Sequence, residues 1–366
     1  MSISVQKNEI FFYIAFTFLF MSFFISDIKY DFGNASSMLR YISYVVLVVQ
    51  LLKKKWNLKE LICFGVIQAL CWLFFLITKD IYWGIIVLVI YAGKDIKPEN
   101  IVRYNMLLVS LGIFFVFELS LFEILPNVST PRDGMGGILG DRYAFGFVHS
   151  DVLPVLSLYL ELYYLWIKQK ISILNLSLFI SVELIINNYC DSRIAIFAAI
   201  IVLILGMIFT FFHSKILILI FEKIVYLAVA AFSIFSGLMT VLLLEGGIYD
   251  DIDTFFSGRF RLAILKSVNV GLNALSLHSN DFYFADNIVI DNGYLYIILR
   301  YGYLFIGVFI AINYLLVKKA DKNPIILICI FAIFLLNFID NDLLDYAFLP
   351  FMIYAFSNKI INRKLE

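Results

Sequence analysis

The chain has 366 residues, of which 62% are hydrophobic and only 15% are charged, and its mean hydropathy is +0.93. Soluble domains usually carry about 25% charged residues, so this composition excludes a soluble globular protein. The 28 basic and 28 acidic residues give no net charge, which argues against recruitment of nucleic acid by a bulk field. The four cysteines have neither the close spacing of a metal site nor a secreted disulfide pattern, and we expect no bound metal and no cofactor.

Apolar runs of the roughly 20 residues that a helix needs to cross a bilayer recur along the whole chain. The first run follows Lys7 and lacks a small-residue cleavage pattern, so we expect it to remain as a membrane span. The sequence predicts an all-α, polytopic integral membrane protein that forms a single domain over residues 1–366, with about twelve spans and a range of ten to thirteen. The expected spans are 10–26, 38–52, 60–78, 80–93, 101–125, 144–167, 171–189, 193–212, 216–244, 292–317, 324–339 and 343–357.

Lysine predicts how these spans are oriented, because cytoplasmic connections of membrane proteins are rich in basic residues. With the amino terminus inside, the clusters around Lys54, Lys94, Lys168, Lys215 and Lys318 and the basic carboxyl tail all fall on the cytoplasmic side. Both termini are then cytoplasmic, and residues of about 245–291 form one large extracytoplasmic loop.

Arginine is distributed the other way. In this topology 16 of 19 lysines lie on or near the inner side, whereas seven of nine arginines lie in the outer half. The positive-inside rule counts both residue types, so topology does not explain the difference. A guanidinium binds phosphate oxygens through two parallel hydrogen bonds, which a lysine does not reproduce. We therefore predict a phosphate or pyrophosphate at the outer face; the alternative is that these arginines reach lipid headgroups or pair with nearby aspartates.

The first polar motif is GDRYAFGFVHSD at 140–151, where an outer loop enters the sixth expected span. Arg142 and His149 are seven residues apart, so they share a face if the segment is helical. Asp151 lies shallowly in the same span. The glycine-bearing stretch just upstream, 134–137, could form a phosphate-binding nest or simply a flexible loop.

The second motif, DSR at 191–193, opens the eighth expected span. Ser192 can cap that helix, but capping does not explain Arg193.

The third motif, SGRFR at 257–261, lies in the large loop and precedes a short interfacial helix at 262–270. Arg259 and Lys266 are seven residues apart, whereas Arg261 falls on the opposite side from Arg259. A basic amphipathic helix resting on headgroups is the alternative to a binding role.

The fourth motif, DNGYLYIILRYG at 291–302, lies where the large loop returns to the membrane. Asn292, Tyr296 and Arg300 are four residues apart and form one polar stripe on a helix. Because Arg300 lies well into an apolar run, we expect it to face the interior of the bundle. An ion pair with an aspartate is the structural alternative.

The order and placement of RYAFGFVHSD, DSR, SGR and DNGYL with RYG beyond it resemble the Wzy-type polysaccharide polymerases of bacterial capsules and O-antigens, which are relatives of the O-antigen ligases. The resemblance covers about residues 132–310. It implies a GT-C-like membrane protein of the bacterial cytoplasmic membrane that uses an undecaprenyl-pyrophosphate-linked glycan as donor and a lipid-linked repeat unit as acceptor. The ligases carry a histidine where this chain has Asp291, which favours a polymerase.

The resemblance also implies roles for the motif residues, without a metal. Breaking the bond between the anomeric carbon and pyrophosphate develops negative charge that arginines stabilise. The attacking sugar hydroxyl needs a proton acceptor, for which Asp291, His149 and His278 remain alternatives. The residues expected to bind pyrophosphate or glycan are Arg142, Arg193, Arg259, Arg261, Arg300, Asn292 and Tyr296.

Membrane lipid, a chain-length regulator and a flippase are further expected partners. Two other functions stay open: a lipid-linked oligosaccharide flippase or other secondary transporter, and a ligase that transfers a finished glycan. A transporter usually shows internal repeats and charges near the membrane midplane, whereas here the polar motifs crowd the outer ends of the spans.

Overall fold

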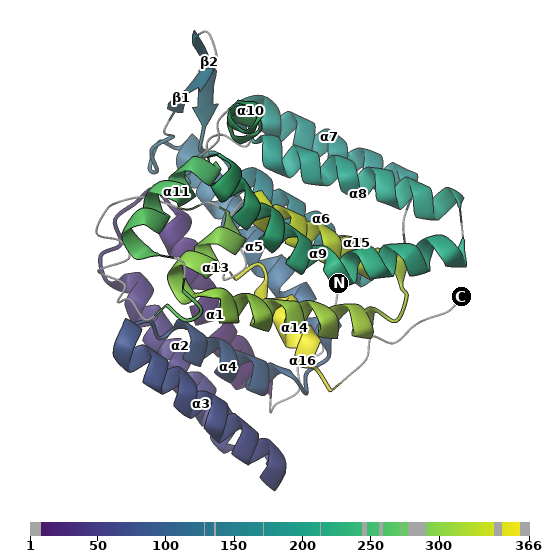
Figure 1. Cartoon of the computed structure of the whole chain (residues 1–366). Coiled ribbons are helices and arrows are strands. Elements are labelled where there is room, and N and C mark those ends of the chain that lie inside the picture. Colours follow the sequence, from purple (N-terminus) through teal and green to yellow (C-terminus); the bar gives the residue numbers. More distant parts are fainter. Residues whose placement is uncertain are drawn as a thin grey trace.

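The computed structural model describes residues 9–358 except 128, 135–136, 171, 213, 244–246, 256–258, 272, 277–289, 291 and 340–345. The structure is 79% helical, with helices packed side by side and one β-hairpin projecting from the bundle (Figure 1). Within the described part, seven helices are long and apolar enough to cross a membrane, and three shorter apolar helices accompany them. The predicted class of all-α, polytopic membrane protein is confirmed, while twelve spans remain a prediction.

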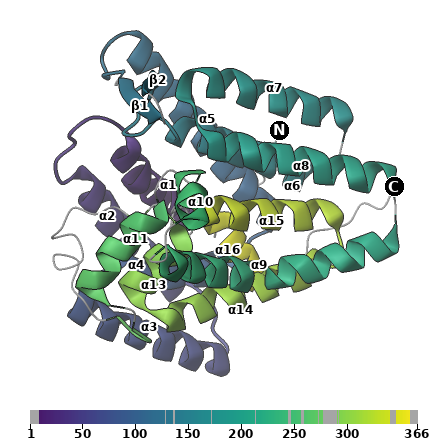
Figure 2. The same cartoon turned by 45° about the horizontal axis from the view of Figure 1, so that its top comes forward.

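Consecutive helices from α1 to α9, and from α14 to α16, alternate in direction, so their ends gather at two opposite ends of the bundle (Figures 1 and 2). The elements are α1 (Ile10–Phe24), η2 (Ile25–Asp27), α2 (Ala35–Leu52), α3 (Leu58–Thr78), α4 (Tyr82–Gly93), α5 (Pro98–Leu121), β1 (Ser129–Gly134), β2 (Gly137–Tyr143), α6 (Val152–Lys168), α7 (Ile173–Cys190), α8 (Arg193–Phe211), α9 (Lys215–Leu242), α10 (Ile248–Phe255), α11 (Arg259–Val270), α13 (Gly293–Tyr301), α14 (Tyr303–Ala320), α15 (Pro324–Ile339) and α16 (Leu349–Phe356).

Several helix boundaries follow from capping chemistry. The side chain of Asn57 accepts a hydrogen bond from the N–H of Lys59 at the start of α3, and Pro98 occupies the first turn of α5, where its missing N–H costs nothing. Helices α3, α6 and α7 end at Lys79, Gln169 and Asp191, each of which adopts a left-handed conformation.

Aromatic side chains fill the centre of the bundle. Helix α6 contributes Tyr163 and Trp166, which are fully buried against Phe351 and Tyr354 of α16. The buried amide nitrogen of Asn105 donates to the hydroxyl of Tyr163 over 2.8 Å, and that hydroxyl donates in turn to the carbonyl of Ala347 inside the apolar core. By contrast, only 6% of the most apolar stretch of α3 is buried inside the protein. Helix α3 therefore lies at the periphery, and its apolar surface suits contact with lipid.

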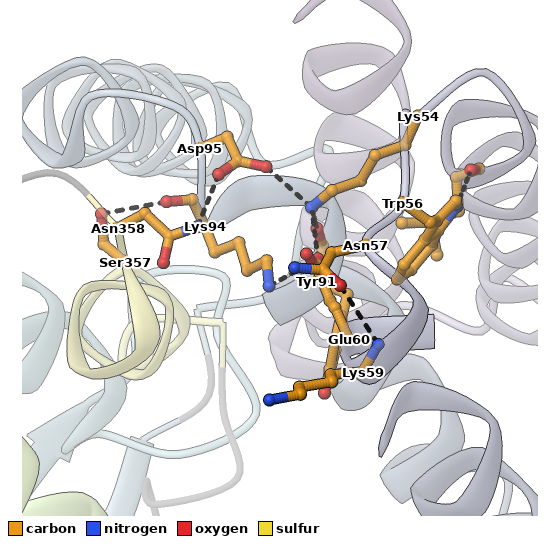
Figure 3. Close-up of polar contacts among 11 residues, drawn as sticks. Lys54, Trp56, Asn57, Lys59, Glu60, Tyr91, Lys94, Asp95, Ser357 and Asn358 are labelled. Carbon is orange, nitrogen blue, oxygen red and sulfur yellow. Dashed lines mark hydrogen bonds and ion pairs between the residues drawn. The ribbon is translucent and has the colours of Figure 1, made fainter. Parts of the chain in front are cut away.

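We call one end of the bundle the lysine end; it consists of the described residues among 53–57, 94–97, 169–172, 212–214, 321–323 and 357–358, with the neighbouring helix ends (Figures 1 and 2). Lys54 pairs with Glu60 and Asp95 at 3.2 and 2.7 Å, and Lys94 pairs with Glu60 at 2.6 Å (Figure 3). Asn358 donates to Asp95 over 2.7 Å, which joins the carboxyl-terminal segment to the α4–α5 connection. Burial acts to raise the pKa of Asp95, but hydrogen bonds from Lys54 and Asn358 outweigh it and hold that pKa below its ordinary value.

The opposite end is the arginine end, formed by residues 25–34, 79–81, 122–151, 191–192 and 243–302 as far as they are described. The N–H of Val148 donates to the carbonyl of Asp27 over 2.8 Å, and the N–H of Lys29 donates to that of Gly146 over 2.9 Å. Both views place the hairpin, α11 and α13 at the left, away from the junction of α8 with α9 at the right (Figures 1 and 2). The connections predicted to share a side of the membrane therefore do lie together.

Three expected spans differ from the structure. The sixth helix begins at Val152 and not at residue 144, because 137–143 pair with 129–134 as an antiparallel hairpin and 144–151 are not helical. The tenth is broken at Gly302, where a φ of 94° separates α13 from α14. The last helix begins only at Leu349.

Candidate functional site

The polar motifs lie where helices begin at the arginine end. The first motif leads into α6, the second into α8, the third into α11 and the fourth into α13. A helix amino terminus carries unsatisfied N–H groups and a partial positive charge, which together favour an anion nearby. The fold thus brings residues from four distant segments to one end of the bundle, as their predicted topology requires.

The first contact between motifs joins Arg259 to Asp151. Their Nη2 and Oδ2 atoms are 3.8 Å apart, and Arg259 is only 9% exposed. The next residue, Phe260, donates its N–H to Asp253 over 2.9 Å and packs its ring against Phe338 of α15. Arg259 is therefore held between α6 and α11 and does not extend toward headgroups.

Lys266 on the same helix is fully buried, so the alternative of a basic face resting on headgroups does not fit α11. Arg261 does fall on the other side of α11, as its spacing predicts. Its side chain is 58% exposed and pairs with Asp250 of α10.

Arg300 forms the second charged contact. Its Nη2 atom is 2.9 Å from Oδ2 of Asp80, and the hydroxyl of Tyr301 donates to the same oxygen over 2.7 Å. The guanidinium also lies over the ring of Tyr296, 5.3 Å from its centre, so two members of the predicted stripe are in contact. The ion pair considered as an alternative is present.

The apolar run around Arg300 suggested a position deep in the bundle, but Arg300 lies near the arginine end. Asp80 belongs to the short connection between α3 and α4 at the arginine end, and α13 stops one residue after Arg300. Arg40 of α2 lies within electrostatic reach of both Asp80 and Arg300. This group therefore brings together helix α2, the α3–α4 connection and the end of α13.

Asn292, the third member of the stripe, serves the protein's own structure. Its oxygen accepts from the N–H of Leu295 over 2.9 Å and so caps α13. Its Nδ2 donates to the carbonyl of Phe338 over 2.6 Å and to Ser236 over 3.1 Å. These contacts fix the start of α13 between α9 and α15.

The two arginine groups lie toward opposite ends of α13. Phe260 and Asn292 both contact Phe338 near the start of α13, whereas Ser276, beyond α11, donates its N–H to the carbonyl of Tyr301. Helices α11 and α13 are thus neighbours. With a rise of 1.5 Å per residue, the eight steps from Asn292 to Arg300 separate the groups by about 12 Å along the helix.

The first motif is not helical, so the prediction that Arg142 and His149 share a helical face is wrong. Arg142 lies in β2 opposite Thr130, and His149 lies in the partly exposed turn before α6. The Nε of Arg142 is buried and has no hydrogen-bond partner among the described residues. Phe145 packs against Tyr189, with ring centres 6.0 Å apart, and so attaches this segment to α7.

The remaining predicted site residues are only partly described. Asp291 and His278 lie outside the described residues, as does the side chain of Arg193, although Arg193 begins α8. Ser192 precedes α8, but its hydroxyl makes no capping hydrogen bond there.

Sequence reasoning missed Asp80, Glu161 and Glu183. Asp80 follows Lys79, which has a left-handed conformation, and its side chain accepts a hydrogen bond from the N–H of Tyr82 over 3.0 Å. In the sequence, the feature that could have identified Asp80 is an aspartate immediately before an apolar run. Glu161 and Glu183 were visible as glutamates near the middle of apolar spans, which are costly in a membrane.

Comparison of the chain with protein-family models, with curated proteins and with solved structures finds no match in any of the three.

Proposed function

We propose that this protein is a glycosyltransferase that polymerises undecaprenyl-pyrophosphate-linked repeat units at the arginine end, which faces outward from a bacterial cytoplasmic membrane. One observation carries the proposal: most arginines and most lysines lie at opposite ends of the bundle, and Arg259 and Arg300 each pair with an aspartate just before the start of a helix. The order of the four polar motifs, which resembles that of polysaccharide polymerases, is the reason for proposing glycosyl transfer as the reaction.

The proposed reaction needs no oxidant or reductant. A sugar hydroxyl of the acceptor attacks the anomeric carbon of the donor, the new glycosidic bond forms, and the bond to pyrophosphate breaks. The hydroxyl proton passes to Asp291, His149 or His278, and the leaving undecaprenyl pyrophosphate takes the electron pair. Arg259 and Arg300 stabilise the charge that develops on the leaving phosphate.

The aspartates beside these arginines are compatible with such a role. Pairing with Asp151 or Asp80 fixes each guanidinium before substrate arrives, which lowers the cost of ordering it on binding. The spacing of about 12 Å along α13 leaves room for two lipid-linked pyrophosphates, one for the donor and one for the acceptor.

The orientation is tested by reporter fusions. Fusions at Lys54, Gln169 and Lys319 should report the cytoplasm, whereas fusions at Asn127 and Asp253 should report the outside. A cytoplasmic signal at Asp253 would contradict the proposed site.

The function is tested by deleting the gene in its host and labelling lipid-linked glycans separately on each leaflet. Loss of a polymerase should leave single repeat units on the outer leaflet and remove long polymer. Long polymer of unchanged yield in the deletion strain would refute the proposal.

A lipid-linked oligosaccharide flippase is a second candidate, and one observation favours it: two carboxyl groups are buried near the middle of α6 and α7. In the same experiment, loss of a flippase would leave single units on the inner leaflet.

A further inference from the structure

Helices α6 and α7 bury two glutamates at similar depth. Glu161 is 6% exposed and Glu183 is fully buried, and the two carboxyl groups are close enough to interact electrostatically. Glu161 lies nine residues after the start of α6 and Glu183 seven residues before the end of α7. At 1.5 Å per residue, they lie about 14 and 10 Å from the arginine end. Both are therefore deep in the apolar part of the bundle.

The packing of α7 shows that Glu183 is directed inward. The described buried residues of this helix are Leu176, Glu183 and Cys190, which are seven residues apart and so lie on one narrow face. Across the interface, Ser157 of α6 faces Glu183 and lies on the same side of its helix as Glu161. Glu183 thus lies at the centre of the face of α7 that contacts the protein, while the rest of the surface of α7 suits lipid.

Neither carboxyl is neutralised within the described part of the chain. Oε1 of Glu161 is buried without a hydrogen-bond partner among the described residues, the polar group that approaches Glu183 is the hydroxyl of Ser157, and no ion pair joins either residue to a described basic group. An ionised carboxylate in this position costs several kcal/mol. Among the described residues, the pair therefore lacks a compensating positive charge.

The groups that face the pair from neighbouring elements do not supply that charge. Tyr159 and Tyr163 lie on α6, and Cys190 lies on α7, while Cys329 of α15 contacts the carbonyl of Leu162. The described side chains of α8 are apolar apart from Thr210. On α5 the charged residues are confined to the first two turns and the last turn: Glu99, Arg103 and Glu118.

Polar groups continue from the pair to the arginine end. Asn187 is one turn beyond Glu183, and its buried Oδ1 has no partner among the described residues. Cys190 lies within electrostatic reach of both Glu183 and Asp151, and Asp151 is the partner of Arg259.

We propose that Glu161 and Glu183 form an intramembrane site for one monovalent cation, either a proton shared by the two carboxyls or a sodium ion. In the first form one carboxyl carries the proton and donates it as a hydrogen bond to the other, which stays ionised; in the second both carboxylates coordinate the ion. Either form reduces the charge of the pair from two negative charges to one. The site is independent of the polymerase proposal, because it rests on burial and not on the arginines.

The test uses the full chain, purified in lipid nanodiscs. Infrared spectra at pH 7 are recorded for the protein and for Glu161→Gln, Glu183→Gln and the double variant, with Glu222→Gln on α9 as a matched control. Because an ordinary glutamate has a pKa of about 4.3, a protonated carboxyl band at pH 7 marks a buried proton. In parallel, thermal unfolding is compared in sodium chloride and choline chloride.

A protonated carboxyl band that the double variant loses and Glu222→Gln retains supports the proton form. A rise in the unfolding temperature specific to sodium, abolished in the double variant, supports the sodium form. Absence of both the band and the sodium effect in the unmodified protein overturns the proposal, whatever the glycan experiments show.

Discussion

The two ends of the bundle use opposite charges in different ways. At the lysine end, Lys54 and Lys94 share Glu60, and half-exposed Asp95 connects to the carboxyl-terminal segment (Figure 3). At the arginine end, the guanidiniums of Arg259 and Arg300 are each paired with a carboxylate just before the start of a helix. Exposed pairs contribute about 0–1 kcal/mol each, whereas breaking a buried pair costs about 3–5 kcal/mol. The paired lysines and arginines are buried to a similar degree, so the two ends differ most clearly at one carboxylate partner each: Asp80 is 8% exposed and Asp95 is 50% exposed.

The largest difference in stability is expected between alanine variants of two aspartates, one at each end of the bundle. Asp80→Ala should lower the free energy of unfolding by about 3 kcal/mol, because the largely buried guanidinium of Arg300 loses its partner. Asp95→Ala, at the half-exposed pair with Lys54, should cost less than about 1 kcal/mol. Denaturation in detergent measures both changes. Equal losses for the two variants would show that the ends do not differ in this way.

A second contrast concerns Gly302, at the helix break, and Gly307, inside the following helix α14. A Cβ at Gly302 would lie 2.5 Å from the carbonyl oxygen of Ala274, and its φ of 94° suits only glycine. Gly302→Ala should therefore lower the free energy of unfolding by about 1–3 kcal/mol. Gly307→Ala in α14 has open space around the new Cβ and should be neutral or slightly stabilising. Unfolding temperatures that rank the two variants the other way would contradict the break at Gly302.

The smallest effect is a pH dependence at the lysine end. Because the folded protein holds the pKa of Asp95 below its ordinary value, the unfolded chain binds the proton more tightly. The stabilisation is complete above the unfolded pKa of about 3.9 and is lost as pH falls through the lower, folded value. The stability difference between the protein and Asp95→Asn should stay constant from about pH 7 to 5 and shrink below about pH 4. A difference that grows on acidification would reverse the assigned direction.

The sequence predicted which connections share an end, because the alternation of apolar runs and the sorting of lysine are long-range regularities. It did not predict the hairpin at 129–143, whose glycines and proline indicated a loop, nor the break at Gly302, since apolar residues continue on both sides of one glycine. The contact of Arg300 with Asp80 joins residues 220 positions apart, and no local pattern encodes it.

The central claim is that the arginine end binds pyrophosphate, and arginine-to-lysine exchange tests it most directly. Polymer length and yield are measured in the deletion strain complemented with Arg142→Lys, Arg193→Lys, Arg259→Lys or Arg300→Lys, at matched protein levels. Each exchange keeps the charge and removes only the two-pronged hydrogen bonding, so polymer should be shortened or lost. Lys53→Arg and Lys318→Arg, at exposed positions of the lysine end, should leave polymer unchanged. Wild-type polymer from all four arginine variants would contradict the claim.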